Sequence, residues 1–310
     1  MPPSGSERVP VLLDCDPGHD DAIAILLALA SPELDLIGVT TVAGNQTLEK
    51  TTANAIRVLD FAGRPDVPVA AGAPAPLERE LRVAAAVHGE SGLDGPDLPP
   101  PAREPLPAHA VDFIAERIVR SDRPVTLVPT GPLTNVALLL RRRPGAARQV
   151  ERVVLMGGAL GRGNVTAAAE FNIWADPEAA AAVFSSGLDV TMVGLDVTHR
   201  ALVLPEHAEA LRGSGRVGRL IAELLDFYGR VHLDSGFAGS PVHDALALAS
   251  VARPELLVTE ARRITVLLEP DEERGRTVAE ESDDARVKAA VDVDSGAFVE
   301  LLLSRIPTLG

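Results

Sequence analysis

The chain has 310 residues, a length that fits one large domain or two small ones. Its net charge of −15 argues against the basic face needed to bind nucleic acid or an anionic membrane, so we expect neither partner. Hydrophobic residues make up 46% of the chain but aromatic residues only 3%, so a sizeable core must consist mainly of Ala, Val and Leu.

The chain contains one cysteine, Cys15, so no disulfide can form within it and a reducing compartment is expected. The first residues lack the charged and apolar pattern of a signal peptide. No apolar run reaches the roughly 20 residues that cross a bilayer. These features predict a cytoplasmic protein.

Short apolar runs alternate with longer amphipathic stretches along the chain. The predicted strands are residues 9–13, 34–42, 67–70, 125–128, 150–156, 188–193, 264–268 and 289–293. The predicted helices are residues 20–30, 47–62, 111–119, 133–142, 179–185, 220–231, 245–251 and 298–305. Residues 1–8 are expected to be a loose tail and residues 9–310 a single domain. The Pro- and Gly-rich segment 72–107 has little periodicity, which is typical of functional or mobile segments.

This alternation predicts an α/β fold, in which an open, mostly parallel sheet is flanked by helices. The strands are continuously apolar, as expected when both faces of a sheet are buried. Ligands of such sheets bind beyond the carboxyl ends of the strands. Residues 14–21, Asn45, Thr130 and Met156 all follow predicted strands, so we expect the functional site at that edge.

Acidic residues are crowded where the first predicted strand meets the first helix. They are Asp14, Asp16, Asp20 and Asp21. Like charges this close repel unless a cation or a shared proton lies among them. A helix cap explains one carboxylate but not four. Hard cations such as calcium or magnesium prefer oxygen ligands, so the cluster predicts a metal site, with a capped helix and exposed acids as the alternative.

Two later segments are less specific. His243 and Asp244 directly precede an apolar helix, where a simple cap and a functional site are equally possible. Residues 169–177 combine Glu, Asn and Asp with Phe and the only Trp, which suits a sugar or base pocket but also a surface loop.

Several nucleotide and nucleophile motifs are absent. No Gly-x-Gly-x-x-Gly follows the first strand, and there is no P-loop sequence. No Gly-x-Ser-x-Gly nucleophile elbow is present. Lysine occurs only at positions 50 and 288, which disfavours phosphoryl-binding and Schiff-base lysines.

In combination, the motifs resemble the inosine-uridine preferring family of nucleoside hydrolases, from residue 9 to the terminal helix. The Asp-x-Asp-Pro-Gly-x-Asp-Asp stretch matches the specific signature of that family. The further matches, in the same order, are Val-Ala-Gly-Asn45, His88-Gly, Pro-Thr130-Gly-Pro-Leu-Thr-Asn, Leu-Met156-Gly-Gly, Glu170-Phe-Asn172 and Pro-Val-His243-Asp244.

The resemblance implies calcium-dependent hydrolysis of the N-glycosidic bond of ribonucleosides to free base and ribose. The calcium ligands that it implies are Asp16, Asp21, the Thr130 carbonyl and Asp244. The substrate-binding residues that it implies are Asp20, Asn45, His88, Met156, Asn164, Glu170, Phe171 and Asn172. Asp14 would lie behind the ligands and orient them.

The chemistry follows from charge. Carboxylates stabilise the positive charge that develops on the ribose. The resemblance makes Asp16 the general base toward water and His243 the acid for the leaving base. A histidine at position 243 favours pyrimidine, inosine or unselective hydrolysis over a purine-only enzyme. Either Tyr228 or His232 could contact the base, and a homodimer or homotetramer is expected.

Two other classes of function fit parts of the sequence. A metal-dependent phosphohydrolase could use Asp14 or Asp16 as its nucleophile, but the chain lacks a suitably placed lysine. A non-catalytic nucleoside or ribose sensor could retain the metal site, although every expected catalytic position is filled.

Overall fold

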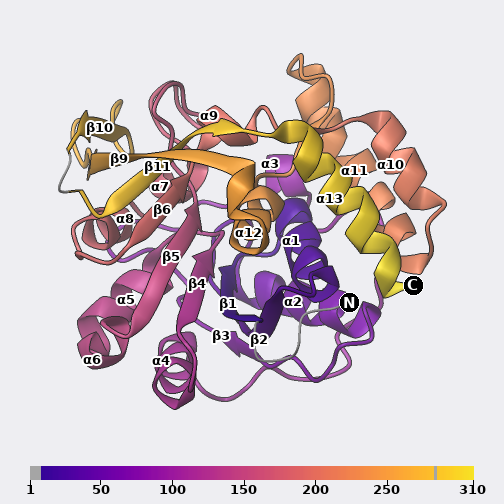
Figure 1. Cartoon of the computed structure of the whole chain (residues 1–310), viewed down its shortest axis with the longest axis horizontal. Coiled ribbons are helices and arrows are strands. Elements are labelled where there is room, and N and C mark those ends of the chain that lie inside the picture. The colour runs from indigo at the N-terminus through magenta and orange to yellow at the C-terminus, as the bar shows by residue number, and fades with distance from the viewer. Residues whose placement is uncertain (1–7, 283–284) are drawn as a thin grey trace.

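The computed structural model describes residues 8–282 and 285–310, and a nine-stranded sheet forms its centre (Figure 1). In spatial order its strands are β10 (Thr277–Glu281), β9 (Leu257–Val266), β11 (Val287–Val293), β6 (Val190–Val193), β5 (Val150–Met156), β4 (Val125–Pro129), β1 (Val9–Cys15), β2 (Leu34–Thr41) and β3 (Val69–Ala71). Neighbouring strands from β3 to β11 are parallel, whereas β9 pairs antiparallel with both β11 and β10. The predicted single-domain α/β fold is confirmed.

Helices cover both faces of the sheet, and each face has its own apolar core. One face packs against α1 (His19–Ala30), α2 (Leu48–Phe61), α11 (Arg216–Asp234), α12 (His243–Ala252) and α13 (Ser295–Arg305). The other face packs against α4 (Ala110–Arg120), α5 (Thr134–Arg142) and α8 (Pro177–Phe184). Successive side chains of β1 alternate between the two cores, since Val11 and Leu13 join the first and Leu12 the second. Burying each of these side chains contributes about 1.5–3 kcal/mol.

The helices α1 and α12 are apolar around most of their circumference, and they pack against each other. This burial explains why both sequences lack a polar face. Each helix carries acidic residues in its first turn, namely Asp20 and Asp21 in α1 and Asp244 in α12. The packing of the two helices therefore brings together acids that are more than two hundred residues apart in the chain.

The remaining elements are short or lie near the edges of the fold. They are α3 (Ala85–His88), α6 (Pro144–Ala147), α7 (Phe171–Ala175), α9 (Leu195–Thr198), β7 (Leu202–Val203), α10 (Pro205–Arg212), β8 (Ser240–Pro241), η1 (Pro254–Leu256) and η2 (Ile306–Leu309). The segment 72–107, expected to be irregular, contains the single turn α3 and one isolated β-bridge, from Leu106 to Ala70.

The sequence prediction was least accurate at the antiparallel edge. The strand expected at residues 264–268 is β9, which starts at Leu257 and ends at Val266, and β10 was not predicted. Most of β9 is exposed and carries charged side chains, so it shows no continuous apolar run. Similarly, α11 begins at Arg216 instead of residue 220, because its first turn contains few apolar residues.

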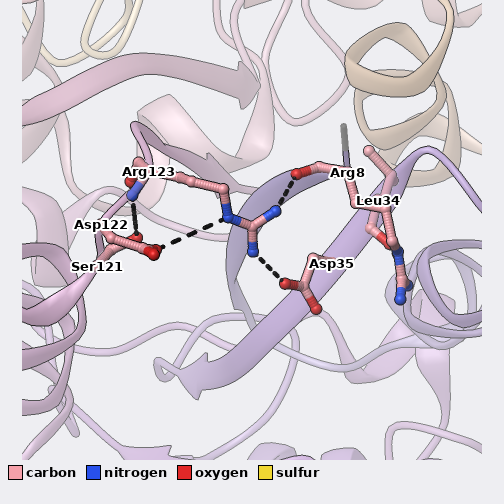
Figure 2. A network of polar contacts seen from close by, with 6 residues as sticks. All are labelled: Arg8, Leu34, Asp35, Ser121, Asp122 and Arg123. Atoms are coloured by element: carbon pink, nitrogen blue, oxygen red, sulfur yellow. Dashed lines mark hydrogen bonds and ion pairs between the residues drawn. The ribbon is translucent and has the colours of Figure 1, made fainter. Parts of the chain in front are cut away.

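The expected tail, residues 1–8, lies outside the described residues except for Arg8. The Arg8 side chain donates to the Leu34 carbonyl over 2.8 Å from Nε. Arg123 donates from Nη1 to the Arg8 carbonyl over 2.6 Å and from Nη2 to Asp35 over 2.7 Å (Figure 2). These hydrogen bonds connect Arg8, directly before β1, with the first residues of β2. Within the described residues, no helix has the length and apolarity needed to cross a membrane.

Candidate active site

Five buried aspartates meet at the carboxyl edge of the sheet. They are Asp14 and Asp16 at the end of β1, Asp20 and Asp21 in the first turn of α1, and Asp244 in the first turn of α12. None is more than 5% exposed. Among the described residues, Asp20, Asp21 and Asp244 form the group whose carboxylate oxygens lie within 4.8 Å of one another. This group includes Asp20, which the resemblance assigns to ribose, and does not include Asp16.

Burial strongly disfavours the charged forms of these acids. It raises the pKa of Asp20 to about 7, with a further contribution from Asp21. It also raises the pKa of Asp21 to about 6. The pKa values of Asp16 and Asp244 lie well above the ordinary range, first because of burial and then because of the neighbouring aspartates. A bound cation would reverse this penalty.

Asp16 is held by close backbone contacts. Its Oδ2 accepts the Asn45 N–H over 2.6 Å, whereas its Oδ1 is buried and has no hydrogen-bond partner within the described chain. A Cβ atom at Gly44 would lie 2.1 Å from Oδ2, and one at Gly131 would lie 2.6 Å from Oδ1. Glycine at these two positions therefore leaves the space that the carboxylate occupies.

Asp21 is oriented by three donors. The Thr130 hydroxyl donates to its Oδ1 over 2.8 Å. The Gly18 N–H and the Asn45 amide donate to its Oδ2 over 3.0 and 3.2 Å. The Thr130 carbonyl accepts from Asn172 Nδ2 over 2.7 Å, so Thr130 connects the aspartates to the polar segment of α7.

Asp14 lies beneath the other acids. Its Oδ1 accepts from the Thr40 hydroxyl over 2.6 Å and from the Asn135 amide over 2.8 Å. Its Oδ2 is buried without a partner in residues 8–282 and 285–310. Burial raises the Asp14 pKa to about 6. Asp14 thus contacts the residues that support the site and does not line the cavity described next.

A cavity of about 810 Å³ opens above the aspartates. The expected residues that line it are Asp20, Asn45, His88, Thr130, Met156, Asn164, Glu170, Phe171, Asn172, His243 and Asp244. Asp16 and Asp21 do not line it and lie deeper. Both Tyr228 and His232 line the cavity. The volume is within the range of small-molecule sites.

Glu170 and Asn172 are fixed at one side of the cavity. Glu170 Oε1 accepts the Asn172 N–H over 2.8 Å, and its Oε2 accepts the N–H groups of Gly158 and Ile173 over 2.9 and 3.2 Å. Burial raises the pKa of Glu170 to about 7. Asn172 also donates to the Met156 carbonyl over 3.2 Å. Behind them, the Asn164 side chain accepts the backbone N–H of the residue after Glu170 over 2.9 Å.

Histidines cluster at another part of the cavity. The His243 ring lies 5.5 Å from that of His199 and 6.3 Å from that of His232, centroid to centroid. Burial lowers the pKa of His243 well below its ordinary value, and the neighbouring histidines lower it further. The Nδ1 atom of His243 lies 2.7 Å from the Thr198 hydroxyl. His243 is therefore neutral near pH 7, with one ring nitrogen held by Thr198.

Tyr228 lies close to both the histidines and the acids. Its ring stacks on His88 at 5.5 Å and meets His232 edge-on at 4.4 Å. Burial raises the pKa of Tyr228 well above its ordinary value, and Asp20 and Asp244 raise it further. Tyr228 thus lies toward the aspartates, whereas His232 lies toward His243.

Sequence reasoning missed Thr198 and His19. His19 lies within the signature, but it was read as a spacer; its Nδ1 is 3.1 Å from His88 Nδ1 and its Nε2 is 2.8 Å from the Asp94 carbonyl. Thr198 ends the short helix α9 that follows β6, so the sequence could have indicated its place near this edge of the sheet but not its contact with His243.

An open parallel sheet, a buried acidic cluster at its carboxyl edge and a cavity lined by neutral histidines are typical of the active site of an enzyme that acts on a small molecule. Residues 11–300 match the family described as inosine-uridine preferring nucleoside hydrolase. The chain belongs to this family, so the predicted family and enzyme class are confirmed.

Relatives are similar over nearly the whole chain. It is 50% identical over 305 residues to a pyrimidine-specific ribonucleoside hydrolase, RihA, of Citrobacter koseri, covering 96% of this chain and 98% of the relative. A protein of the same name from Escherichia coli O9:H4 is 51% identical with the same coverage. The structure of a purine-preferring ribonucleoside hydrolase from Gardnerella vaginalis superposes with a TM-score of 0.92 at 35% identity, covering 97% of this chain and 98% of that one.

Proposed function

We propose that the protein hydrolyses the N-glycosidic bond of ribonucleosides, with a preference for pyrimidine ribonucleosides, and that it requires calcium. The observation that carries this proposal is a single cavity that joins a buried acidic cluster to the neutral His243. Relatives named for pyrimidine-specific hydrolysis support the preference at about half identity. Three imidazoles near the cavity, at His199, His232 and His243, also suit the polar edges of a pyrimidine.

The donor set fits a hard divalent cation. All donors are oxygens, the three close carboxylates are buried, and the Oδ1 atom of Asp16 has no hydrogen-bond partner among the described residues. The residues proposed to hold calcium are Asp16, Asp21, the Thr130 carbonyl and Asp244. Bound calcium would supply a fixed positive charge that orients water and the ribose hydroxyls.

In the proposed reaction, Asp16 is the general base. Its Oδ2 is occupied by the Asn45 N–H, which leaves Oδ1 to accept a proton from the attacking water. As the bond to the base breaks, positive charge develops on the ribose ring. The surrounding carboxylates stabilise that charge without moving, because hydrogen bonds already fix them.

His243 is proposed to act as the acid toward the leaving base by donating a hydrogen bond from its neutral Nε2–H, which stabilises the negative charge that develops on the base. A neutral imidazole donates from Nε2 only if Nδ1 carries no proton, and Nδ1 is the atom that faces Thr198. His88, which also lines the cavity and whose ring stacks on Tyr228, would contact the base as well.

The ribose is proposed to bind between two polar groups. Asp20 and Asn45 approach from the acidic cluster, and Glu170 and Asn172 from α7. Met156, Asn164 and Phe171 complete the same wall. Glu170 keeps an acceptor position on Oε1 beyond its bond to the Asn172 N–H, so it can accept one ribose hydroxyl.

Release of free ribose from a panel of purine and pyrimidine ribonucleosides, with and without calcium chelation, tests this function. We expect fastest release from uridine or cytidine and loss of activity on chelation that calcium restores. Faster release from purine ribonucleosides would overturn the preference, and full activity in excess chelator would overturn the calcium requirement.

We also propose a homodimer or homotetramer in the cytoplasm. The resemblance to the family supports the assembly. The buried thiol of Cys15, whose Sγ lies 3.6 Å from the Thr40 carbonyl, is compatible with a reducing compartment. Light scattering at assay concentration would test the assembly, and a monomer mass would contradict it.

A further inference from the structure

The turn after β5 orients the ribose-binding wall. Gly157 and Gly158 have positive φ angles of 157° and 79°, a conformation that favours glycine. This turn directs the Gly158 N–H to Glu170 Oε2 over 2.9 Å. Directly before the two glycines, the Met156 carbonyl accepts from the Asn172 amide over 3.2 Å. The position of the turn therefore sets the orientation of both Glu170 and Asn172.

Three backbone donors aim the Glu170 carboxylate. Its Oε2 accepts two N–H groups, from Gly158 and Ile173, which use both lone pairs of that oxygen. Its Oε1 accepts one N–H, from Asn172, so one acceptor position remains for the cavity. A shift of the Gly158 N–H would rotate the carboxylate and misdirect that position.

A threonine that is distant in sequence, Thr277, hydrogen-bonds to the residue directly after the Gly157-Gly158 turn. Thr277, at the start of β10 and 4% exposed, accepts the Ala159 N–H on its Oγ1 over 3.0 Å. The same hydroxyl donates to the Ala159 carbonyl over 2.6 Å. A Cβ atom on Gly158 would lie 3.2 Å from Thr277 Cγ2. Thr277 thus satisfies both backbone groups of Ala159 and packs on the neighbouring glycine.

The β9–β10 hairpin contacts the ribose-binding wall at a second point. A Cβ atom on Gly275, whose φ is 81°, would lie 2.7 Å from the Cα atom of Trp174 in α7. The Arg274 guanidinium lies over the Trp174 ring, 4.9 Å from its centroid. The turn of the hairpin is therefore packed directly against the helix that carries Asn172.

We propose that Thr277 is a positioning residue for ribose recognition, acting through Ala159 and Gly158 on the Glu170 carboxylate. This inference rests on the proposed function, in which Glu170 accepts a ribose hydroxyl. It gives the antiparallel edge of the sheet a role in substrate recognition. Thr277 itself does not line the cavity and has no part in bond cleavage.

The test compares Thr277→Val, which keeps the side-chain shape but removes both hydrogen bonds, with Thr277→Ser, which keeps the hydroxyl. Thr265→Val on the neighbouring strand is the matched control, because Thr265 is exposed and its side chain makes no hydrogen bond in the described chain. We expect Thr277→Val to lower kcat/KM for uridine by on the order of tenfold. Thr277→Ser and Thr265→Val should stay within about twofold.

Analogues of uridine that lack the 2′-, 3′- or 5′-hydroxyl separate positioning from a general structural effect. Glu170→Gln identifies the hydroxyl that Glu170 contacts, since its effect should vanish on the analogue without that hydroxyl. The effect of Thr277→Val should vanish on the same analogue. An equal loss on all analogues, or no loss with uridine, would overturn the inference about Thr277.

The proposed ribose contact of Glu170 can be disproved independently of the role of Thr277. If Glu170→Gln is fully active on uridine and on every analogue, the ribose contact itself is wrong, whatever Thr277→Val does. Thermal unfolding of each variant shows whether it is folded. If Thr277→Val does not fold, Thr277→Ala is measured in its place. A loss of activity in Thr277→Ala that persists on the analogue lacking the hydroxyl that Glu170 contacts would also overturn the inference.

Discussion

The Thr198 hydroxyl oxygen lies 2.7 Å from Nδ1 of His243, at the end of α9 and the start of α12. Both residues are buried, and the pKa of His243 is held well below its ordinary value by burial. If Thr198 donates its proton to Nδ1, the ring proton is on Nε2, which is the tautomer that a neutral acid needs. The contact fixes the orientation of the His243 ring, and a donating Thr198 hydroxyl also fixes its tautomer.

Replacing Thr198 by valine should slow hydrolysis of uridine by on the order of tenfold or more, because His243 can then adopt the unproductive tautomer. Thr198→Ser should retain most of the activity. A riboside with a p-nitrophenolate leaving group, which leaves without protonation, should be hydrolysed almost normally by Thr198→Val. Equal losses on both substrates would mean that Thr198 does not act through the leaving group.

The affinity of variants for calcium can decide whether Asp16 or Asp20 is the third carboxylate ligand. The geometry groups Asp20 with Asp21 and Asp244, whereas the family resemblance assigns Asp16 as the ligand. We expect calorimetry to show that Asp21→Asn and Asp244→Asn weaken calcium binding most. If Asp16 is the ligand, Asp16→Asn will weaken binding more than Asp20→Asn does. The reverse order would move Asp20 from the ribose to the metal.

Stability without calcium should fall as the pH rises. Burial raises the pKa of Asp20 and Glu170 to about 7, above the values near 4 expected in the unfolded chain. Their contribution to the free energy of unfolding is therefore fully present below about pH 4 and is lost as the pH rises through about 7. Buried histidines such as His88 and His243, whose pKa is lowered by burial, change stability in the opposite direction below about pH 6.5, so the loss from the carboxyls is isolated above that pH.

Thermal unfolding in a chelator, between about pH 6.5 and pH 8, measures this loss. Over this range the unfolding midpoint should decrease with pH, and calcium should raise it more at pH 8 than at pH 6.5, since calcium and protons compete for the same carboxylates. Glu170→Gln should have a shallower decrease. A midpoint that increases with pH in chelator would contradict the burial argument.

The parallel part of the fold was predictable because most residues of its strands are buried. An apolar run such as β1 is required when both faces of a strand contact helices, and Asp14 marks where that run ends. The polar residues after the strands then gather at one edge for topological reasons alone. This is why Asn45, Thr130 and Met156 were placed in one site from sequence.

The residues that act through others could not be predicted in this way. Thr277 belongs to a strand with little apolar character, and its contact with Ala159 spans 118 residues. Thr198 reaches His243 only because α9 and α12 pack together. A single threonine carries no sequence pattern of its own, so its role depends on tertiary contacts that local sequence does not encode.

In the proposed mechanism, Asp16 takes the proton from the attacking water within an intact calcium and ribose site. The most direct measurement is release of uracil from uridine by Asp16→Asn in saturating calcium, with binding of both ligands measured separately. We predict that the variant is folded and binds uridine, yet releases uracil at least roughly a hundredfold more slowly than the native enzyme. Near-native release by a folded Asp16→Asn protein would show that Asp16 is not the general base.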